Sequence, residues 1–214
     1  MKIPKDQINK ITDARLRLLE AAVWLFAEQG INGTTVAEIA QLADVTSAMV
    51  HYYFKTKDQL LDAVVDEKLV GEFFTFVDVV QIQEQTSAIE LVENLVWRII
   101  NATDKMPWLP PLWIREVLSE GGMLREKLIV HAGFGKKLNF KEIFIMAQQE
   151  GKINNEIDPG LLFLSVMGLT LLPLSVAKSW ECIPLIGKVS KQELGKHVTA
   201  LLKNGLAVPG SERK

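Results

Sequence analysis

Cysteine is almost absent from this 214-residue chain, which contains only Cys182. A single cysteine excludes an internal disulfide and is typical of a reducing compartment, so we expect a cytoplasmic protein. The three histidines, His51, His131 and His197, are far apart in the sequence. None has the spacing of a metal-ligand cluster or of a nucleophile–base pair. The sequence therefore predicts no metal site, no cofactor and no catalytic residues.

An excess of charge of one sign is also lacking. The chain has 24 Lys and Arg against 26 Asp and Glu, which gives a formal net charge of −2. This balance excludes binding to nucleic acid through a global positive field. Any such affinity would have to come from locally placed cations and helix termini.

Residues 34–60 carry the most specific pattern in the chain. Thr35 and Glu38 have the spacing of a capping box, so a helix is expected to begin directly after the threonine. Apolar residues follow at helical intervals as far as Ala43. Asp44 lies where the chain must reverse, and aspartate tolerates the left-handed conformation of such a turn.

A second helix is expected at 47–53, capped by Thr46 or by its own first residue. It would bury Val50 and then Phe54, and a further capping signal opens a third helix at Lys57. Two short helices joined by a tight turn form a helix-turn-helix motif, whose second helix enters the major groove of DNA.

The outward face of this second helix carries groups suited to a groove. Small residues at its start permit a close approach, Met49 can touch a thymine methyl, and tyrosine hydroxyls can reach phosphates or base edges. The alternative is that Tyr52 and Tyr53 only pack the motif. The predicted DNA-contacting residues are Thr34, Thr35, Thr46, Ser47, Ala48, Met49, His51, Tyr52, Tyr53 and Lys57.

Several stretches in this region match one family pattern in order. They are Phe26-Ala27-Glu28-Gln29-Gly30, Thr34-Thr35-Val36-Ala37-Glu38-Ile39-Ala40, Ala43-Asp44-Val45-Thr46, Val50-His51-Tyr52-Tyr53-Phe54 and Thr56-Lys57-Asp58-Gln59-Leu60. Residues 15–65 thus resemble the N-terminal domain of the TetR (tetracycline repressor) family of transcriptional regulators. Three positions depart from the family pattern: Asp44 and Ala48 replace glycines, and His51 replaces a phosphate-contacting tyrosine. The resemblance implies a dimer that binds operator DNA and a small effector.

The remaining chain shows helical periodicity and no strand pattern. A first helix is expected from Thr12 or Asp13, with Leu16, Leu19, Val23 and Phe26 inside, a Gly30 C-cap and a loose segment 1–11 before it. Further helices are expected at 57–80, 89–102, 112–120, 123–150 (bent near Gly133 and Gly135), 159–178 (kinked at Pro173) and 190–202, with a turn at 106–111, breaks at 81–87 and 179–188 and a frayed final dozen residues.

The predicted fold is therefore all-α. An N-terminal three-helix DNA-binding domain, residues 1–56, precedes a larger helical effector-binding and dimerisation domain, residues 57–214, and helix 57–80 connects the two. Aromatic and thioether side chains with a few polar groups suggest a pocket in the larger domain. The candidates are Trp97, Trp113, Glu116, His131, Phe134, Met146 and Met167. Ordinary core packing is the alternative explanation for each of them.

Residues 159–177 contain no charged side chain and are long enough to compare with a membrane span. The run also contains glycine, serine, threonine and proline, so we interpret it as a buried helix of a dimer core and expect no membrane association. Together with 190–203 it is the predicted dimer interface. The N-terminus has no apolar signal core.

These features favour a ligand-responsive repressor that binds a near-palindromic operator as a homodimer. A small apolar effector would shift the helix around 107–122, and the helix at 57–80 would move with it. Two alternatives stay open from the sequence. One is an all-helical enzyme, and the other is a protein-only adaptor that retains the helix-turn-helix.

Overall fold

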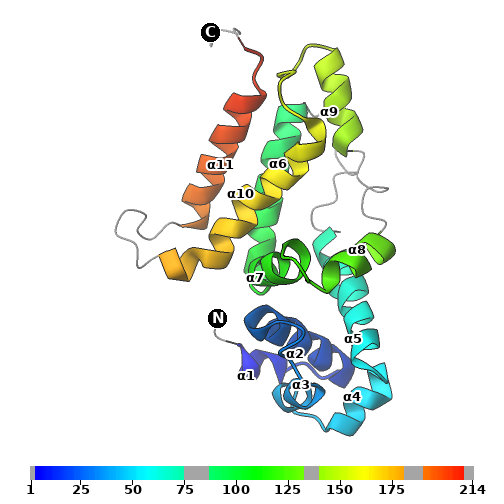
Figure 1. Ribbon diagram of the computed structural model, residues 1–214. Helices are drawn as coiled ribbons and strands as arrows, with labels where there is room; N and C mark the ends of the chain where they lie inside the picture. The colour runs from blue at the N-terminus through cyan, green and yellow to red at the C-terminus, as the bar shows by residue number, and fades with distance from the viewer. Residues whose placement is uncertain (1–2, 75–86, 133–139, 181–189, 210–214) are drawn as a thin grey trace. The chain divides into compact units, whose positions relative to one another are not determined.

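The structure, a computed structural model, describes residues 3–74, 87–132, 140–180 and 190–209, and every regular element in these ranges is helical. The predicted all-α class is confirmed. In chain order the elements are α1 (Lys5–Ile8), α2 (Ala14–Gln29), α3 (Val36–Leu42), α4 (Ser47–Phe54), α5 (Lys57–Ala63), η1 (Val64–Phe74), α6 (Ala88–Lys105), α7 (Leu109–Trp113), η2 (Ile114–Leu118), α8 (Leu124–Ala132), α9 (Phe140–Gln149), α10 (Pro159–Trp180) and α11 (Lys191–Leu206) (Figure 1). The π-helical segments η1 and η2 directly continue α5 and α7.

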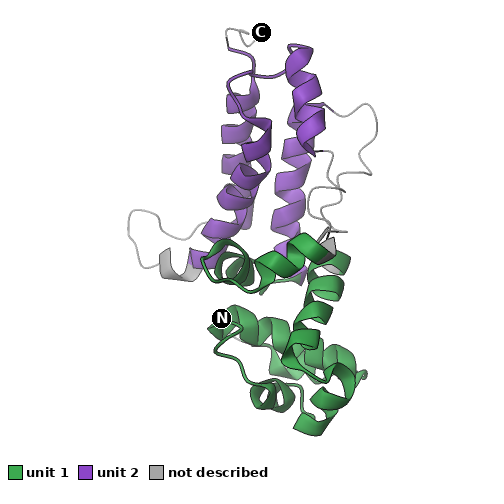
Figure 2. Cartoon of the chain, turned by 45° about the vertical axis from the view of Figure 1, so that its right-hand side comes forward, with its two compact units in different colours: residues 1–75, 106–134 green, residues 76–105, 135–214 purple. Residues whose placement is uncertain are grey.

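The chain forms two compact units, each made of two stretches of sequence (Figure 2). The first unit comprises Met1–Thr75 and Met106–Phe134, and the second comprises Phe76–Lys105 and Gly135–Lys214. The functional division expected at residue 56 stays a prediction.

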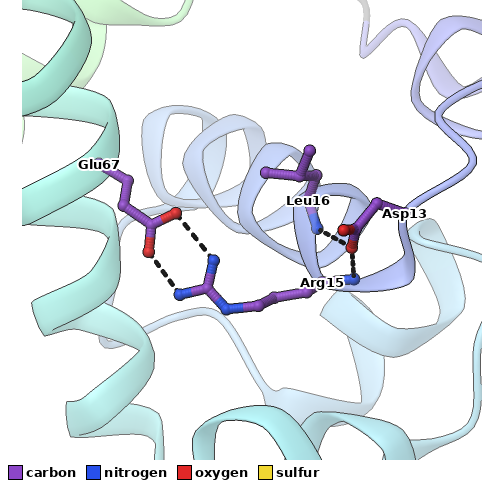
Figure 3. A network of polar contacts seen from close by, with 4 residues as sticks. All are labelled: Asp13, Arg15, Leu16 and Glu67. Carbon is purple, nitrogen blue, oxygen red and sulfur yellow. Dashed lines mark hydrogen bonds and ion pairs between the residues drawn. The ribbon is translucent and has the colours of Figure 1, made fainter.

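The N-terminal segment differs from the expected loose tail. It contains the short helix α1, anchored by Ile8, whose side chain is 2% exposed. Ile8 is the buried residue of this single turn, which packs against the neighbouring helix α2. Asp13 is the N-cap of α2, because its carboxylate accepts the backbone N–H groups of Arg15 at 2.7 Å and Leu16 at 3.1 Å (Figure 3).

Helix α2 is the core of the first unit. Leu19, Val23 and Phe26 are fully buried, as predicted. Leu16 was expected beside them, but it lies in the first turn and its side chain is 41% exposed. The helix ends at Gly30, which has a φ of +82° and a backbone N–H bonded to the Phe26 carbonyl at 3.0 Å.

Ion pairs fasten the long helix α5–η1 within this unit. Arg15 makes a bidentate contact with Glu67 (Figure 3), and Lys68 pairs with Glu20 at 2.5 Å.

The helix predicted at 57–80 is continuous from residue 57 to 74, and residues 75–80 lie outside the described ranges. Most of the predicted breaks at 81–87 and 179–188 also lie outside these ranges.

The segment expected to be a turn at 106–111 is partly helical. Helix α7 begins at Leu109, because Pro110 and Pro111 fall in its first turn, where a backbone N–H has no intrahelical acceptor. The helix runs on through η2, and the chain then turns at Gly121, whose φ is +77°. Helix α7 packs on α2, and α8 packs on η1.

In the second unit, α6 packs against both α10 and α11, and α10 also contacts α9. The N-caps follow their local sequence: Asp158 caps α10, and Ser190 forms a capping box with Glu193 before α11. Pro173 lies inside α10, and Gly151, with a φ of +66°, follows α9. The bend expected near Gly133 and Gly135, between α8 and α9, lies outside the described residues.

The C-terminal helix is longer than predicted. Helix α11 extends to Leu206, whose side chain is 1% exposed and whose carbonyl accepts the N–H of Asn154 at 2.9 Å. A tertiary contact thus orders residues that the polar sequence suggested would fray.

Helix α10 has the composition of a membrane span. Residues Pro159–Ala177 have a mean hydropathy of 2.0, and only 28% of that window is buried inside the chain. One such helix is weak support for a membrane span, since the core helix of a soluble protein passes the same test. Its exposed leucines include Leu161, Leu164 and Leu172.

Candidate nucleic-acid interface

The helix-turn-helix forms as its capping signals predict. Thr35 accepts the Glu38 N–H through its hydroxyl at 3.2 Å, and the Glu38 carboxylate accepts the Thr35 N–H at 2.7 Å. Asp44 adopts a left-handed conformation with a φ of +53°. The N–H of Val45 then bonds to the Ala40 carbonyl at 3.0 Å, which closes the turn between α3 and α4.

Helix α4 buries one side and exposes the other. Val50 and Phe54 are each 3% exposed, so their predicted burial is confirmed. The opposite side presents Tyr52, which is 79% exposed, and Tyr53, which is 37% exposed. The exposed side also includes Thr46, Ser47, Ala48 and His51, with Met49 half-buried. This set, Thr46 to Tyr53 without Val50, is called the α4 face below.

Aromatic contacts and a ring–carbonyl contact fix the end of the α4 face. The rings of Tyr52 and Tyr53 pack edge to face with centroids 5.1 Å apart. The Nδ1 atom of His51 lies 3.1 Å from the Lys55 carbonyl oxygen, at the C-terminal end of the helix.

Three other predicted DNA-contacting residues, Thr34, Thr35 and Lys57, make hydrogen bonds within the motif. The Thr34 side chain is 2% exposed, and its hydroxyl donates to the Gly30 carbonyl at 2.7 Å. Thr35 is exposed but is engaged in the capping box of α3. The Lys57 ammonium donates to the carbonyls of Ile31 and, at 2.6 Å, Thr34. The structure therefore does not place the Thr34 and Lys57 polar groups with the α4 face.

Sequence reasoning missed several residues that hold the motif in place. Arg17 donates to the carbonyl of Ala43 at 3.0 Å and to that of Ile11 at 2.9 Å. Its guanidinium thus joins the end of α3 to the N-terminal segment. Lys127 on α8 pairs with Asp58 at 2.8 Å and Asp62 at 2.6 Å on α5. No local pattern signals the contacts with Ala43, Asp58 and Asp62, because these partners are remote in sequence.

Hydrogen bonds and ion pairs in the first unit shift the pKa values of the Glu38, Glu67 and Lys127 side chains. A backbone N–H and the hydroxyl of Thr35 bond to Glu38 and lower its pKa. The hydrogen bonds from Arg15 likewise lower the pKa of Glu67. Burial alone would lower the pKa of Lys127, but its bonds and ion pairs with two aspartates outweigh that effect and raise it.

The predicted effector-pocket residues divide between the two compact units. Trp113 and Glu116 are buried in the first unit, whereas Trp97, Met146 and Met167 belong to the second. Met146 is 59% exposed and Met167 is 2% exposed. Trp97 packs so closely on Gly195 that a Cβ atom there would lie 2.5 Å from its ring.

The side chains of the pocket candidates His131 and Phe134, and that of Cys182, are not among those that the structure describes. Phe134 and Cys182 lie outside the described residues altogether. Among the described residues, no group of three His, Cys, Asp or Glu side chains could hold a metal ion. The pocket set stays a prediction.

The buried polar candidate, Glu116, has well-defined partners. Its carboxylate accepts the backbone N–H of Ile31 at 2.9 Å and that of Met123 at 3.3 Å, and the residue is 6% exposed. Both carboxylate oxygens are therefore used within the first unit, next to the end of α2.

Comparison with known proteins finds bacterial regulators that are similar to this chain. The family model described as "Bacterial regulatory proteins, tetR family" matches residues 18–64. The probable HTH-type transcriptional regulator YttP of Bacillus subtilis is 31% identical over 140 residues, which are 65% of this chain and 65% of that relative. The match to YttP thus spans less than two thirds of its length.

Matches over nearly the whole chain are more distant. The HTH-type transcriptional repressor KstR2 of Mycobacterium tuberculosis is 21% identical across 94% of this chain and 97% of its own. The KstR2 structure superposes with a TM-score of 0.69 at 20% identity, covering 93% of this chain and 97% of that chain. AibR, solved with isovaleryl coenzyme A and operator DNA, has a TM-score of 0.66 at 19% identity, over 91% of this chain and 100% of that one.

The motif and the fold thus agree with the comparisons. The family match covers α3, α4 and α5 together with most of α2. The distant structures share the fold along almost the entire chain. Residues 18–64 thus match the tetR family of bacterial regulatory proteins, and the chain shares its fold with the two solved structures.

Proposed function

We propose that this protein is a cytoplasmic, DNA-binding transcriptional repressor without catalytic activity. It binds a near-palindromic operator as a homodimer and is released by a small apolar effector. The observation that carries the proposal is the α4 face, because buried Val50 and Phe54 leave the opposite side of the helix open to a DNA groove. The relatives compared are named as transcriptional regulators.

The α4 face suits a major groove in shape and chemistry. A B-DNA major groove about 12 Å wide admits one helix. Small side chains at Ser47 and Ala48 allow the start of α4 to approach the base edges, and Met49 offers an apolar contact. The tyrosine hydroxyls supply neutral donors, which suits a chain with a net charge of −2.

Dimerisation is supported by the surface of the second unit. Leu161, Leu164 and Leu172 on α10 are 59%, 52% and 44% exposed, and Leu201 on α11 is 50% exposed. A second copy of the chain would cover these side chains. Two-fold symmetry would then present two α4 helices to major-groove sites about 34 Å apart, or a multiple of that spacing.

We assign effector binding to residues 57–214, and DNA binding to residues 1–56. Apolar side chains of the predicted pocket, such as Trp97 and Met167, would form its wall. The effector would move the helix α7–η2, which lies within the predicted 107–122 segment and packs on α2 in the first unit. It acts only through its different affinity for the DNA-binding and released conformations.

The direct test is binding to the DNA upstream of the chain's own gene. Purified protein should shift a labelled duplex of that region in a gel, and excess shuffled duplex should not compete. The footprint is expected to have two-fold symmetry, with two chains bound to each operator. If no duplex from that region is bound more tightly than shuffled DNA across a range of salt concentrations, the proposal fails.

The effector is tested on the same complex. A panel of small apolar acids and amines is tested first, followed by isovaleryl coenzyme A, the compound with which AibR was solved. An effector should dissociate the duplex at saturation. A compound that binds the protein and leaves its operator affinity unchanged would contradict the coupling for that compound.

A further inference from the structure

The turn that precedes α3 is held from two sides at a single residue. Ile31 is fully buried, directly after Gly30 at the end of α2. Its N–H donates to Oε1 of Glu116 at 2.9 Å, and its carbonyl accepts the ammonium of Lys57. The two partners lie 85 and 26 residues away in the sequence and carry opposite charges.

The contact from η2 is close and directional. A Cβ atom at Gly30 would lie 3.2 Å from Oε1 of Glu116 and 3.3 Å from Cδ of Arg115. Arg115 also donates to the carbonyl of Glu28 at 2.9 Å, in the last turn of α2. A cation there is favoured by the helix dipole. Arg115 and Glu116, consecutive residues of η2, thus both form hydrogen bonds at the end of α2.

The contact from α5 reaches the same turn. Lys57 is the first residue of α5, and its ammonium bonds to the carbonyl of Thr34 as well as to that of Ile31. The Thr34 hydroxyl closes the turn by donating to the Gly30 carbonyl. The next residue, Thr35, is the N-cap of α3. Residues 30–34, called the 30–34 turn below, therefore lead directly into the N-cap of α3.

We propose that Glu116 is a positioning residue for the DNA-facing helices. Its carboxylate and the Lys57 ammonium hold the 30–34 turn through charge-assisted hydrogen bonds to the two polar groups of Ile31. Displacement of η2 removes the acceptor of a buried N–H and releases one side of the turn. This inference rests on the proposed function, since it names the contact through which a shift of α7–η2 reaches α3 and α4.

The first test measures amide hydrogen exchange at Ile31 in the full-length protein. Glu116→Met keeps the side-chain length but removes both acceptor oxygens, so Ile31 exchange should quicken roughly tenfold or more. Glu116→Gln keeps one carbonyl oxygen for that N–H and should restore exchange to near the wild-type rate. Unchanged Ile31 exchange in a folded Glu116→Met protein overturns the proposal.

The second test approaches the turn from the opposite side. Lys57→Met leaves the Ile31–Glu116 bond in place, yet it should also quicken exchange of the Ile31 amide, because the carbonyl side of the turn is released. Lys127→Met is the matched control, since Lys127 pairs with Asp58 and Asp62 on the same α5 helix. Equal effects of the two lysine variants on Ile31, or none, contradict the two-sided hold. This arm decides the matter if Glu116→Met does not fold.

The third test is a double-mutant cycle on operator affinity. Glu116→Met and Lys57→Met should be non-additive by at least about threefold in Kd, because both act on one turn. Glu116→Met with Lys127→Met should be additive. Additivity of the first pair, with wild-type binding intact, overturns the inference and leaves the proposed function standing. If the wild type binds no operator, the proposed function fails, and the exchange measurements alone judge the hold on Ile31.

Discussion

At the scale of single residues, the α4 face and the 30–34 turn have different proposed roles in DNA binding. The exposed tyrosines have the geometry to touch DNA, whereas Thr34 and Lys57 hold the backbone beneath them. The distinction predicts different consequences for substitutions. Changes on the α4 face should alter affinity alone, and changes in the turn should alter both affinity and stability.

Tyr52 provides the clearest case of the first kind. Its side chain is 79% exposed, so Tyr52→Ala should leave the unfolding free energy within about 0.5 kcal/mol of wild type. Loss of one hydrogen bond to DNA should weaken operator binding by about 0.5–1.5 kcal/mol. Fluorescence anisotropy with a labelled operator and urea unfolding measure the two quantities. Gln59→Ala, another exposed position, should change neither.

Gly30 belongs to the second kind. Its φ of +82° and ψ of 162° lie in a region that is essentially restricted to glycine, so Gly30→Ala should destabilise the fold by about 1–3 kcal/mol. The approach of Arg115 and Glu116 leaves little room for the added methyl group. Gly205→Ala in α11 is the matched control, because a Cβ atom there meets nothing within 4 Å.

Urea unfolding of both glycine variants checks this expectation. Alanine at position 205 should stabilise the protein by up to about 1 kcal/mol, since alanine is the better helix former. A Gly30→Ala protein as stable as wild type would show that the turn can relax, and the hold on Ile31 would then not depend on this backbone conformation.

The residues that were predictable from sequence are those with local partners. Thr35 and Glu38 are three positions apart, and the burial of Val50 and Phe54 follows from helical spacing. The Lys57 contacts were not predictable in this way. The sequence suggested a DNA contact for its ammonium group, and the carbonyls that this group reaches lie 23 and 26 residues earlier in the chain.

At the scale of elements, the helices themselves were mostly predictable and their ends less so. Capping residues fixed the starts of α2, α3, α5 and α11, because a cap involves neighbours in the sequence. Helix α1 and the last turn of α11 were missed, since each depends on a tertiary contact of one apolar side chain, Ile8 or Leu206. The prolines at 110 and 111 led to the prediction of a turn, but they lie in the first turn of helix α7, where proline is tolerated.

The joint between α2 and η1 should respond to acid. Glu67 is paired with Arg15, and that hydrogen bonding lowers the pKa of the carboxyl from its ordinary value of 4.5. A lowered pKa in the folded state means that the contribution to stability is present above the ordinary value and is lost as pH falls through the folded-state pKa. Glu67→Gln should therefore destabilise the protein at pH 7 and matter progressively less below about pH 4.5.

Chemical unfolding of wild type and Glu67→Gln between about pH 3 and 7 tests this. The difference in unfolding free energy should shrink towards the acid end. The control is Glu142→Gln on α9, where the glutamate is exposed. A difference that stays constant with pH would mean that Glu67 stabilises the joint by packing and not by its charge.

At the scale of the whole molecule, the two compact units are discontinuous in sequence. Periodicity along the chain could not reveal this, because it reports which face of a helix is apolar and not which helix covers it. The segment from Met106 to Phe134 forms one compact unit with the N-terminal helices. This grouping makes η2 a physical neighbour of the DNA-binding motif.

The uncovered apolar side of α10 and α11 carries the last prediction. Exposed Leu164 and Leu172 lie eight residues apart on α10, with Gly168 between them, where an added Cβ would meet nothing within 4 Å. In one chain this surface faces water, which is unfavourable for such an apolar helix. Sedimentation velocity should therefore detect a wild-type dimer.

Glu substitutions at Leu164 and Leu172 should place charges in the interface and weaken the dimer by at least about tenfold each. Val130→Glu is the matched control, because Val130 on α8 is 77% exposed and belongs to the first unit. It should leave the dimer intact. Since one helix-turn-helix holds only half an operator, the two leucine variants should also lose affinity for the full site while keeping their affinity for a half-site. Dimers that persist in both variants would place the interface elsewhere.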